Sequence, residues 1–154
     1  MKVIVVYDSQ YGNTERIARA IAGAIPSGGV KALRVNEANP MELSSIDLLI
    51  IGSPTQGGRA TSAVQGFIDK IPAATLKTVK VAAFDTRLST KWVGIFGYAA
   101  GRIAKSLTAK GAALIVPPEP FFVIGKAPLL KEGELERAAA WAKGIAEAMK
   151  TRED

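Results

Sequence analysis

Apolar residues in this chain form short continuous runs, separated by longer stretches in which apolar and polar positions alternate in threes and fours. The runs predict five strands, at residues 3–7, 31–35, 48–52, 79–84 and 112–116. Because the runs are continuous, they indicate strands that are covered on both faces. The stretches between them have the spacing of helices with one buried face.

Glycine and proline mark the ends of these elements. Gly28-Gly29 ends the first predicted helix, Pro72 ends the third and Gly111 follows the fourth, whereas the second is reduced to a short turn at 40–43. Pro117-Pro118 limits the fifth strand. The alternation predicts a single α/β domain over residues 1–154, with a doubly wound five-stranded parallel sheet and helices on both faces. In such sheets, ligands bind beyond the carboxyl ends of the strands.

The turn between the first strand and the first helix is rich in hydroxyl groups and contains a glycine. It spans Asp8–Thr14, with Asn13 expected as the N-cap of the helix and Thr14 as the alternative. Such a turn directs free backbone N–H groups and the positive end of the helix dipole at one spot, which favours phosphate binding. The alternative interpretation is a capped helix start without a ligand.

Two further loops should lie beside this turn. The segment 52–59 leaves the third strand as Gly-Ser-Pro-Thr-Gln-Gly-Gly-Arg, in which the proline stiffens the turn and the glycines accept either sign of φ. It suits the presentation of backbone groups to a flat ligand, although it also has the features of an ordinary connection. The segment 84–100 is long for a strand-to-helix connection, and long loops are often functional.

Cysteine and histidine are both absent from the 154 residues. Their absence excludes thiol nucleophiles, disulfides, cysteine or histidine metal sites and histidine-dependent triads. Any redox chemistry must therefore be carried by an organic cofactor.

The net charge is +6, from 20 basic and 14 acidic residues. It indicates either a soluble basic surface or a basic face for an acidic protein partner or an anionic ligand. The basic residues are scattered, which argues against nucleic acid. No apolar run reaches the roughly 18 residues of a membrane span, and no signal peptide is recognisable, so no membrane association and a cytoplasmic location are expected.

Other phosphate-binding classes lack required residues. A phosphate-accepting receiver domain needs an aspartate at the end of the third strand, where Gly52-Ser53 stands. The nucleotide-triphosphatase motif Gly-x-x-x-x-Gly-Lys-Ser/Thr and the dinucleotide motif Gly-x-Gly-x-x-Gly are missing. A tyrosine-phosphatase site needs a cysteine.

The three loops together resemble the flavodoxin family over nearly the whole chain. The matching motifs are Gly12-Asn13-Thr14 in the first loop and the Gly-Ser-Pro-Thr of residues 52–55 in the second. No long insertion follows Val116, so the chain is similar to the short-chain type. The resemblance implies strand order 2-1-3-4-5 and non-covalently held FMN.

The resemblance also implies which residues surround FMN. Those around the phosphate are Ser9, Gln10, Tyr11, Gly12, Asn13 and Thr14. Those along one side of the isoalloxazine are Pro54, Thr55, Gln56, Gly57 and Gly58. Those along the other side are Asp85, Thr86, Arg87, Gly97, Tyr98, Ala99 and Ala100.

The chain departs from the family pattern at the flavin ring. Many flavodoxins have a tryptophan in the second loop, where this chain has Gln56-Gly57. Many are acidic around the cofactor, whereas here Arg59, Arg87 and Lys91 lie in the corresponding loops. The third loop has no obvious glycine-rich match.

Three functions are compatible with the sequence. The first is an FMN electron carrier that docks with a redox partner protein, acidic if the basic surface is used. The second is an FMN-dependent NAD(P)H:quinone-type oxidoreductase. The third is a flavin-free flavodoxin-like domain that acts in regulation or interaction.

Overall fold

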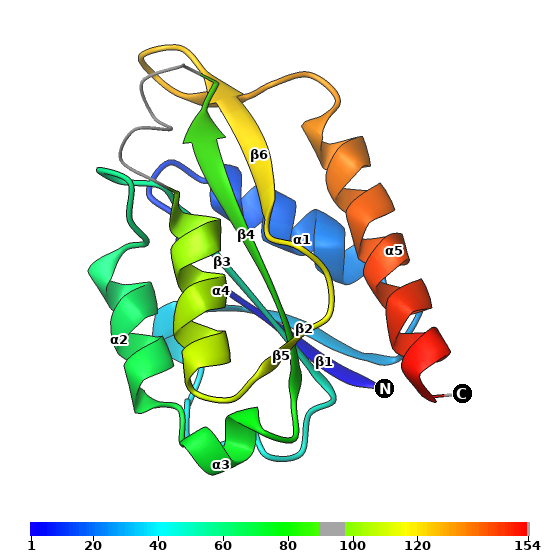
Figure 1. Ribbon diagram of the computed structural model, residues 1–154. Helices are drawn as coiled ribbons and strands as arrows, with labels where there is room; N and C mark the ends of the chain where they lie inside the picture. Colours follow the sequence, from blue (N-terminus) through cyan, green and yellow to red (C-terminus); the bar gives the residue numbers. More distant parts are fainter. Residues whose placement is uncertain (90–97, 154) are drawn as a thin grey trace.

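The computed structural model describes residues 1–89 and 98–153 (Figure 1). Its sheet has the order β2-β1-β3-β4-β6-β7, with β5 paired to β4 off this path. All pairs are parallel except β6–β7. The strands are β1 (Lys2–Tyr7), β2 (Gly29–Arg34), β3 (Leu48–Pro54), β4 (Lys80–Leu88), β5 (Ala113–Leu114), β6 (Glu119–Ile124) and β7 (Leu129–Leu130).

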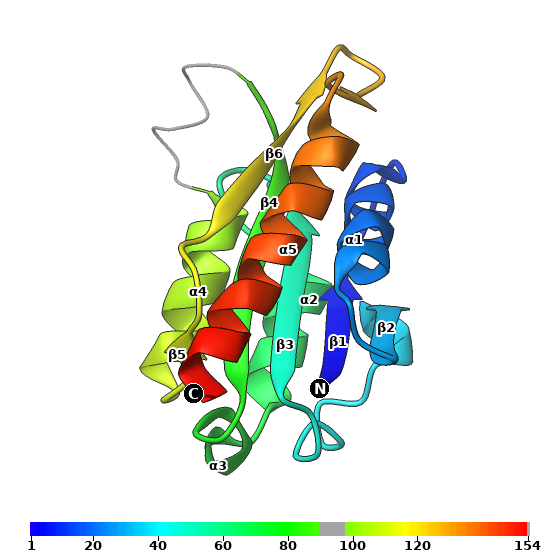
Figure 2. The same cartoon turned by 90° about the vertical axis from the view of Figure 1, so that its right-hand side faces the viewer.

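Helices cover both faces of the sheet, as the alternating pattern predicted (Figure 2). One face carries α1 and α5, and the other carries α2, α4 and the 3-10 helix η1. The helical elements are α1 (Asn13–Ala24), η1 (Val35–Glu37), α2 (Ser62–Lys70), α3 (Ala73–Leu76), α4 (Ala99–Ala109) and α5 (Glu134–Glu153). Within the described residues, no helix combines the length and the apolar character that a membrane crossing requires.

Two apolar layers hold the helices to the sheet. Fully buried Ile51 and Val81 face the α2–α4 side, whereas Ile50 and Phe84 face the α1–α5 side. The central strands are buried on both faces, so burial of their apolar area supplies the main driving force for folding.

The fifth predicted strand, at 112–116, is wrong in its extent. Only Ala113–Leu114 forms β5, and the chain then passes through Pro117 and Pro118 before β6 resumes pairing with β4. Proline lacks the N–H that a strand donates to its neighbour, which explains the interruption. The predicted order 2-1-3-4-5 is confirmed, with the fifth place shared by β5 and β6.

A buried carboxylate joins α5 to β6. Glu134 accepts hydrogen bonds from the backbone N–H of Phe122 at 2.8 Å and from Arg137 Nη2 at 2.7 Å. The Arg137 guanidinium also lies over the Phe121 ring, 4.6 Å from its centroid. The hydrogen bond from Arg137 is the main reason that the pKa of Glu134 is lowered.

Replacing Glu134 by glutamine is expected to reduce the free energy of unfolding by about 1.5 kcal/mol at neutral pH, because Arg137 and the Phe122 N–H then face a neutral amide in place of a carboxylate. The carboxyl has a lower pKa in the folded state, so its contribution is present above its unfolded pKa and disappears as the pH falls through the folded pKa. Urea unfolding of the variant and of the unmodified protein, at pH 7 and in acid, measures the difference in the free energy of unfolding at each pH. Glu136→Gln, at an exposed position of the same helix, is the control; an equal Glu134→Gln deficit at both pH values would contradict the prediction.

Candidate functional site

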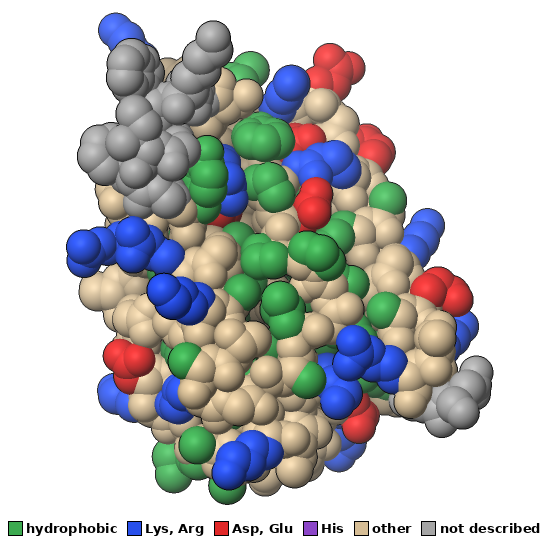
Figure 3. Space-filling view, in the orientation of Figure 1, with side chains coloured by type: hydrophobic (Ala, Val, Ile, Leu, Met, Phe, Trp, Pro, Cys, Tyr) green, Lys and Arg blue, Asp and Glu red, His purple; other side chains and the backbone are tan. Residues whose placement is uncertain are grey.

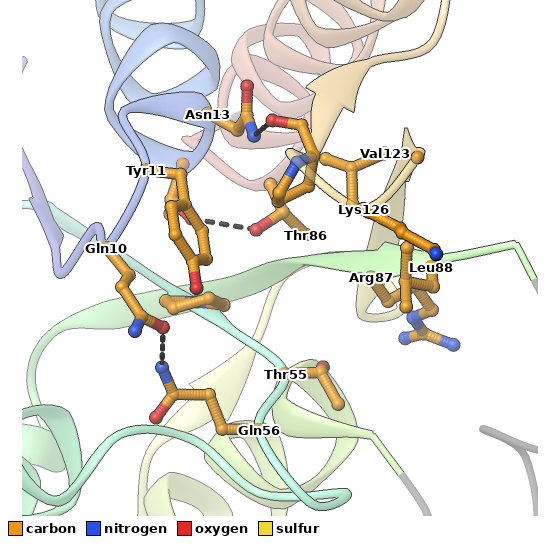
Figure 4. A pocket seen from close by; sticks show the side chains of 14 residues that line it. Gln10, Tyr11, Asn13, Thr55, Gln56, Thr86, Arg87, Leu88, Val123 and Lys126 are labelled. Carbon is orange, nitrogen blue, oxygen red and sulfur yellow. Dashed lines mark hydrogen bonds between the residues drawn. The ribbon is translucent and has the colours of Figure 1, made fainter.

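A cavity of about 400 Å³ opens at the carboxyl ends of β1, β3 and β4 (Figure 4). This is the end of the sheet where the sequence placed the ligand site. The lining residues are Gln10, Tyr11, Asn13, Thr14, Pro54, Thr55, Gln56, Thr86, Arg87, Leu88, Val123, Gly125, Lys126 and Pro128. Nine of the predicted site residues are in this lining, drawn from all three loops.

The first loop enters α1 through Gly12, whose φ of +89° is in the left-handed region that glycine tolerates. Gly12 is the N-cap of α1, so the predicted capping by Asn13, or by Thr14 as the alternative, is wrong. Asn13 is instead the first residue of the helix, and its side-chain amide donates to the carbonyl of Pro128 at 2.7 Å. This bond ties the first loop to the segment between β6 and β7.

Part of the hydrogen-bonding capacity of the first loop is used internally. Ser9 Oγ accepts from the N–H groups of Gly12 and Glu15, at 3.0 and 3.4 Å. The hydroxyls of Thr14 and Thr86 lie 2.7 Å apart and are both buried. The first loop is thereby fixed to itself and to β4.

Four backbone N–H groups of this loop have no hydrogen-bond partner among the described residues: those of Gln10, Tyr11, Asn13 and Thr14. They lie at the positive end of the α1 dipole, where a helix leaves its first donors unsatisfied. Donors of this kind fit a phosphate group.

The second loop is a tight hairpin. The backbones of Gln56 and Arg59 exchange hydrogen bonds of 2.8 and 3.0 Å, and the two residues between them, Gly57 and Gly58, have φ values of +57° and +78°. Positive φ at both central positions is typical of a type I′ turn, for which Gly-Gly is suited. Both glycines are therefore used by the turn and do not line the cavity.

The remaining motif positions of the second loop hold it in place. A Cβ on Gly52 would lie 2.0 Å from Phe84 Cζ, so the Phe84 ring fills the space that a side chain would need and only glycine fits there. Ser53 is fully buried, and its Oγ accepts from the N–H of Thr61 at 3.0 Å. Thr55 Oγ1 accepts from the N–H of Ala99 at 3.0 Å, at the start of α4.

In the third loop, Asp85 is fully buried and joins β4 to α4. Its carboxylate accepts from Arg87 Nε at 2.8 Å, from Arg87 Nη2 at 2.6 Å and from the N–H of Ala100 at 2.9 Å. The Arg87 guanidinium lies over the Tyr98 ring, 3.3 Å from its centroid. Arg87 reaches the cavity wall, whereas Asp85 lies behind it. Gly97, the remaining predicted site residue of this loop, lies outside the described residues.

The cavity has a further wall, beside the three predicted loops, that was not predicted from the sequence. Val123, Gly125, Lys126 and Pro128 come from the end of β6 and the turn to β7, and Leu88 ends β4. Residues 121–123 are apolar, and composition of this kind indicates strand packing and not the wall of a ligand site. A signal for the turn exists in Gly125, whose φ is +90°, followed closely by Pro128.

Two side-chain amides join the first and second loops beside the cavity. Gln56 Nε2 donates to Gln10 Oε1 at 2.6 Å, and both residues line the cavity (Figure 4). Both side chains are exposed, so this bond contributes little to stability.

A doubly wound sheet with a turn of unpartnered N–H groups after β1 and two further loops at the same end is typical of the flavodoxin-like class of α/β proteins. The sequence model of the Flavodoxin family matches residues 5–141. The chain belongs to the flavodoxin family.

Solved flavodoxins have the same fold over their full length. A flavodoxin from the domain Archaea superposes with a TM-score of 0.80 at 25% identity, covering 97% of this chain and 99% of that one. The oxidised Flavodoxin 1 of Bacillus cereus superposes with a TM-score of 0.79 at 20% identity, covering 96% and 98%.

The curated relatives are longer proteins. Putative diflavin flavoprotein A 5 of Nostoc sp. is 43% identical over 70 residues, which are 42% of this chain and 12% of that protein. An NAD(P)H dehydrogenase (quinone) of Gluconacetobacter diazotrophicus is 30% identical over 118 residues, covering 60% of this chain and 59% of that protein. The chain thus matches a small part of the first and somewhat over half of the second.

The donor set of the site fits FMN, the cofactor of the family. Unpartnered N–H groups at a helix N-terminus suit its phosphate, and the mixture of apolar and amide side chains beyond them suits a flat, partly polar ring. The cavity volume of about 400 Å³ is within the usual range of small-molecule sites.

Proposed function

We propose that this protein is an FMN-dependent electron carrier that docks with a redox partner protein. The observation that carries the proposal is the juxtaposition, in one cavity, of the unpartnered N–H groups of the first loop with the second and third loops of the sheet. Bound FMN supplies the one- and two-electron redox chemistry that no side chain of this chain can perform. The protein supplies binding, orientation and electrostatics.

In this proposal, each side of the cavity contacts a different part of FMN. The phosphate is bound by the first loop, Ser9, Gln10, Tyr11, Gly12, Asn13 and Thr14. One side of the isoalloxazine is lined by Pro54, Thr55 and Gln56, with Gly57 and Gly58 shaping the hairpin. The other side is lined by Thr86 and Arg87, with Asp85, Tyr98 and Ala99 behind them and Gly97 assigned by resemblance alone.

Lys126 adds positive charge at the ring end of the cavity, beside the ion pair of Arg87 with Asp85. Arg87 is held by Asp85 and Tyr98, so its position is set before any ligand arrives. Lys126 is exposed and lines the same cavity. Cations at this end would stabilise negative charge on a reduced flavin ring.

The rim of the cavity supports docking of a protein. Tyr11 and Leu129 are 67% and 66% exposed, and Leu88 and Ile124 are also exposed at this end of the molecule. Exposed apolar side chains of this size are typical of interaction surfaces. Together with Lys126 and the net charge of +6, they favour a partner with an acidic surface. We expect the encounter to take place in the cytoplasm, the location predicted from the sequence.

Titration of the apoprotein with FMN tests the proposal. Saturable one-to-one binding, with quenched flavin fluorescence and a perturbed flavin absorbance spectrum, is the expected result. Absence of binding would reject it and would favour the flavin-free domain.

The quinone oxidoreductase is the second candidate, and the likeness to the NAD(P)H dehydrogenase (quinone) of Gluconacetobacter diazotrophicus supports it. If the chain is a carrier, NADH or NADPH alone should not bleach the flavin absorbance of the FMN-loaded protein under anaerobic conditions. Rapid bleaching without a second protein would favour the oxidoreductase.

A further inference from the structure

A second hollow, of about 550 Å³, lies on the α2–α4 face. It is apart from the cavity at the carboxyl ends of β1, β3 and β4, which we call the FMN cavity. Among the described residues, the lining of this second hollow contains three basic side chains and one carboxylate. The basic side chains are Arg59 from the second-loop hairpin and Arg102 and Lys105 from α4, and the carboxylate is that of Asp69. We call this hollow the α2–α4 groove. Figure 3 shows basic side chains gathered over the α2 and α4 side of the molecule.

The basic side chains of the groove are placed by the fold. Arg102 Nε donates to the carbonyl of Gly58 at 2.9 Å, which fixes α4 to the hairpin that ends in Arg59. Arg102 and Lys105 are three positions apart on α4, where like charges repel each other on an isolated helix. Within the described residues, neither Arg59 nor Lys105 forms an ion pair. An anion in the groove would provide a counter-charge for Arg59 and Lys105.

The other wall of the groove offers space and hydrogen-bonding groups. Ser62 on α2 and Ser106 on α4 provide hydroxyl groups, and Gln65 on α2 provides an amide whose Nε2 donates to Asp69 Oδ1 at 2.9 Å. Gly66 lies in the middle of α2, where glycine weakens a helix, and a Cβ built there would meet nothing within 4 Å. A side chain at this position would therefore project into open space in or beside the groove.

We propose that the α2–α4 groove binds the phosphate groups of a nucleotide. The groove is concave and larger than a single phosphate needs, and it combines cations with hydroxyl and amide groups that suit a ribose. None of the groove residues lines the FMN cavity, so this site is separate from the one used by the proposed function.

The FMN-loaded protein is titrated in a calorimeter with 2′,5′-ADP, NADPH, NADH, inorganic phosphate and adenosine at low ionic strength. The compounds that carry the most phosphate charge should bind most tightly. Inorganic phosphate should bind more weakly, and adenosine should show no detectable binding. Raising the salt concentration should weaken binding, because the groove cations are exposed. Failure of all phosphate compounds to bind would overturn the proposal, and binding of polyglutamate in their place would assign the groove to an acidic protein.

Four variants locate the binding. Arg59→Glu combined with Lys105→Glu should weaken nucleotide binding at least tenfold, whereas Lys143→Glu, an exposed charge reversal on α5, should leave it unchanged. Asp69→Asn should strengthen binding about threefold by removing the one opposing charge. Gly66→Leu should raise the Tm while weakening binding, a combination that a purely structural role would not give.

Gly144→Leu, at an open glycine of α5, is the matched control for Gly66→Leu and should raise the Tm without affecting binding. Nucleotide affinity that responds equally to the groove variants and their controls would place the nucleotide elsewhere and overturn the proposal. FMN affinity, measured on every variant, should not change. Failure of FMN binding would reject the proposed function. The same nucleotide titrations would then be carried out on the apoprotein and would still test the groove.

Discussion

Asp85→Ala is expected to lower the free energy of unfolding of the apoprotein by about 3 kcal/mol. The carboxylate is fully buried and accepts three hydrogen bonds, two from Arg87 and one from the N–H of Ala100. Its removal leaves the Arg87 guanidinium, whose side chain is only 11% exposed, without its counter-charge. It also removes the acceptor of the Ala100 N–H at the start of α4, while the bond from the Ala99 N–H to Thr55 Oγ1 stays in place. Chemical denaturation of the apoprotein measures the loss.

Asp47→Ala is the matched control, because Asp47 also accepts a backbone N–H, that of Lys2 at 2.7 Å, but is exposed. Asp47→Ala should lower the free energy of unfolding by less than about 1 kcal/mol. Arg87→Met introduced together with Asp85→Ala should recover part of the stability, because no charge is then left unpaired. If Asp85→Ala costs no more than Asp47→Ala, the buried pair does not stabilise the fold as argued.

Most of the fold could be predicted because burial determines the pattern of the sequence. Strands covered on both faces must be continuously apolar, and the helices that cover them must have one apolar face, so the alternation was visible without coordinates. The end of the chain was harder. The apolar residues 112–116 have the composition of a strand, but the prolines that follow shift most of the pairing with β4 to β6. How the pairing with β4 is divided between the two neighbouring apolar runs depends on their register with β4, which composition does not show.

The candidate site could be predicted only in its backbone features. The glycines and hydroxyls of the first two loops specify turns, and turns are local. The choice of Gly12 over Asn13 as the N-cap was missed because the Asn13 amide is drawn to the carbonyl of Pro128, 115 positions away. Likewise, nothing local to Asp85 shows that its carboxylate faces α4 and not the cavity. The direction of the Asn13 amide and that of the Asp85 carboxylate are both determined by contacts between distant segments of the chain.

FMN is expected to bind at least about 100-fold more tightly than riboflavin, which lacks the phosphate. Each charge-assisted hydrogen bond to the phosphate contributes about 1.5–3 kcal/mol, and two such bonds already give a factor of that size. The ring end lacks a tryptophan in the second loop, so the phosphate should carry a large share of the affinity. Fluorescence titrations of the apoprotein with both flavins give the ratio.

Gly12→Ala should reduce this FMN-to-riboflavin ratio to about tenfold or less, because an alanine at φ +89° is strained and the N–H groups that follow it lose their common direction. Gly133→Ala is the matched control: Gly133 has a φ of +88°, and at both glycines a Cβ would meet nothing within 4 Å, but Gly133 does not line the FMN cavity. Both variants should lose about 1 kcal/mol of stability. Only Gly12→Ala should change the ratio. An equal change in both would mean that general destabilisation, and not the geometry of the first loop, weakens FMN binding.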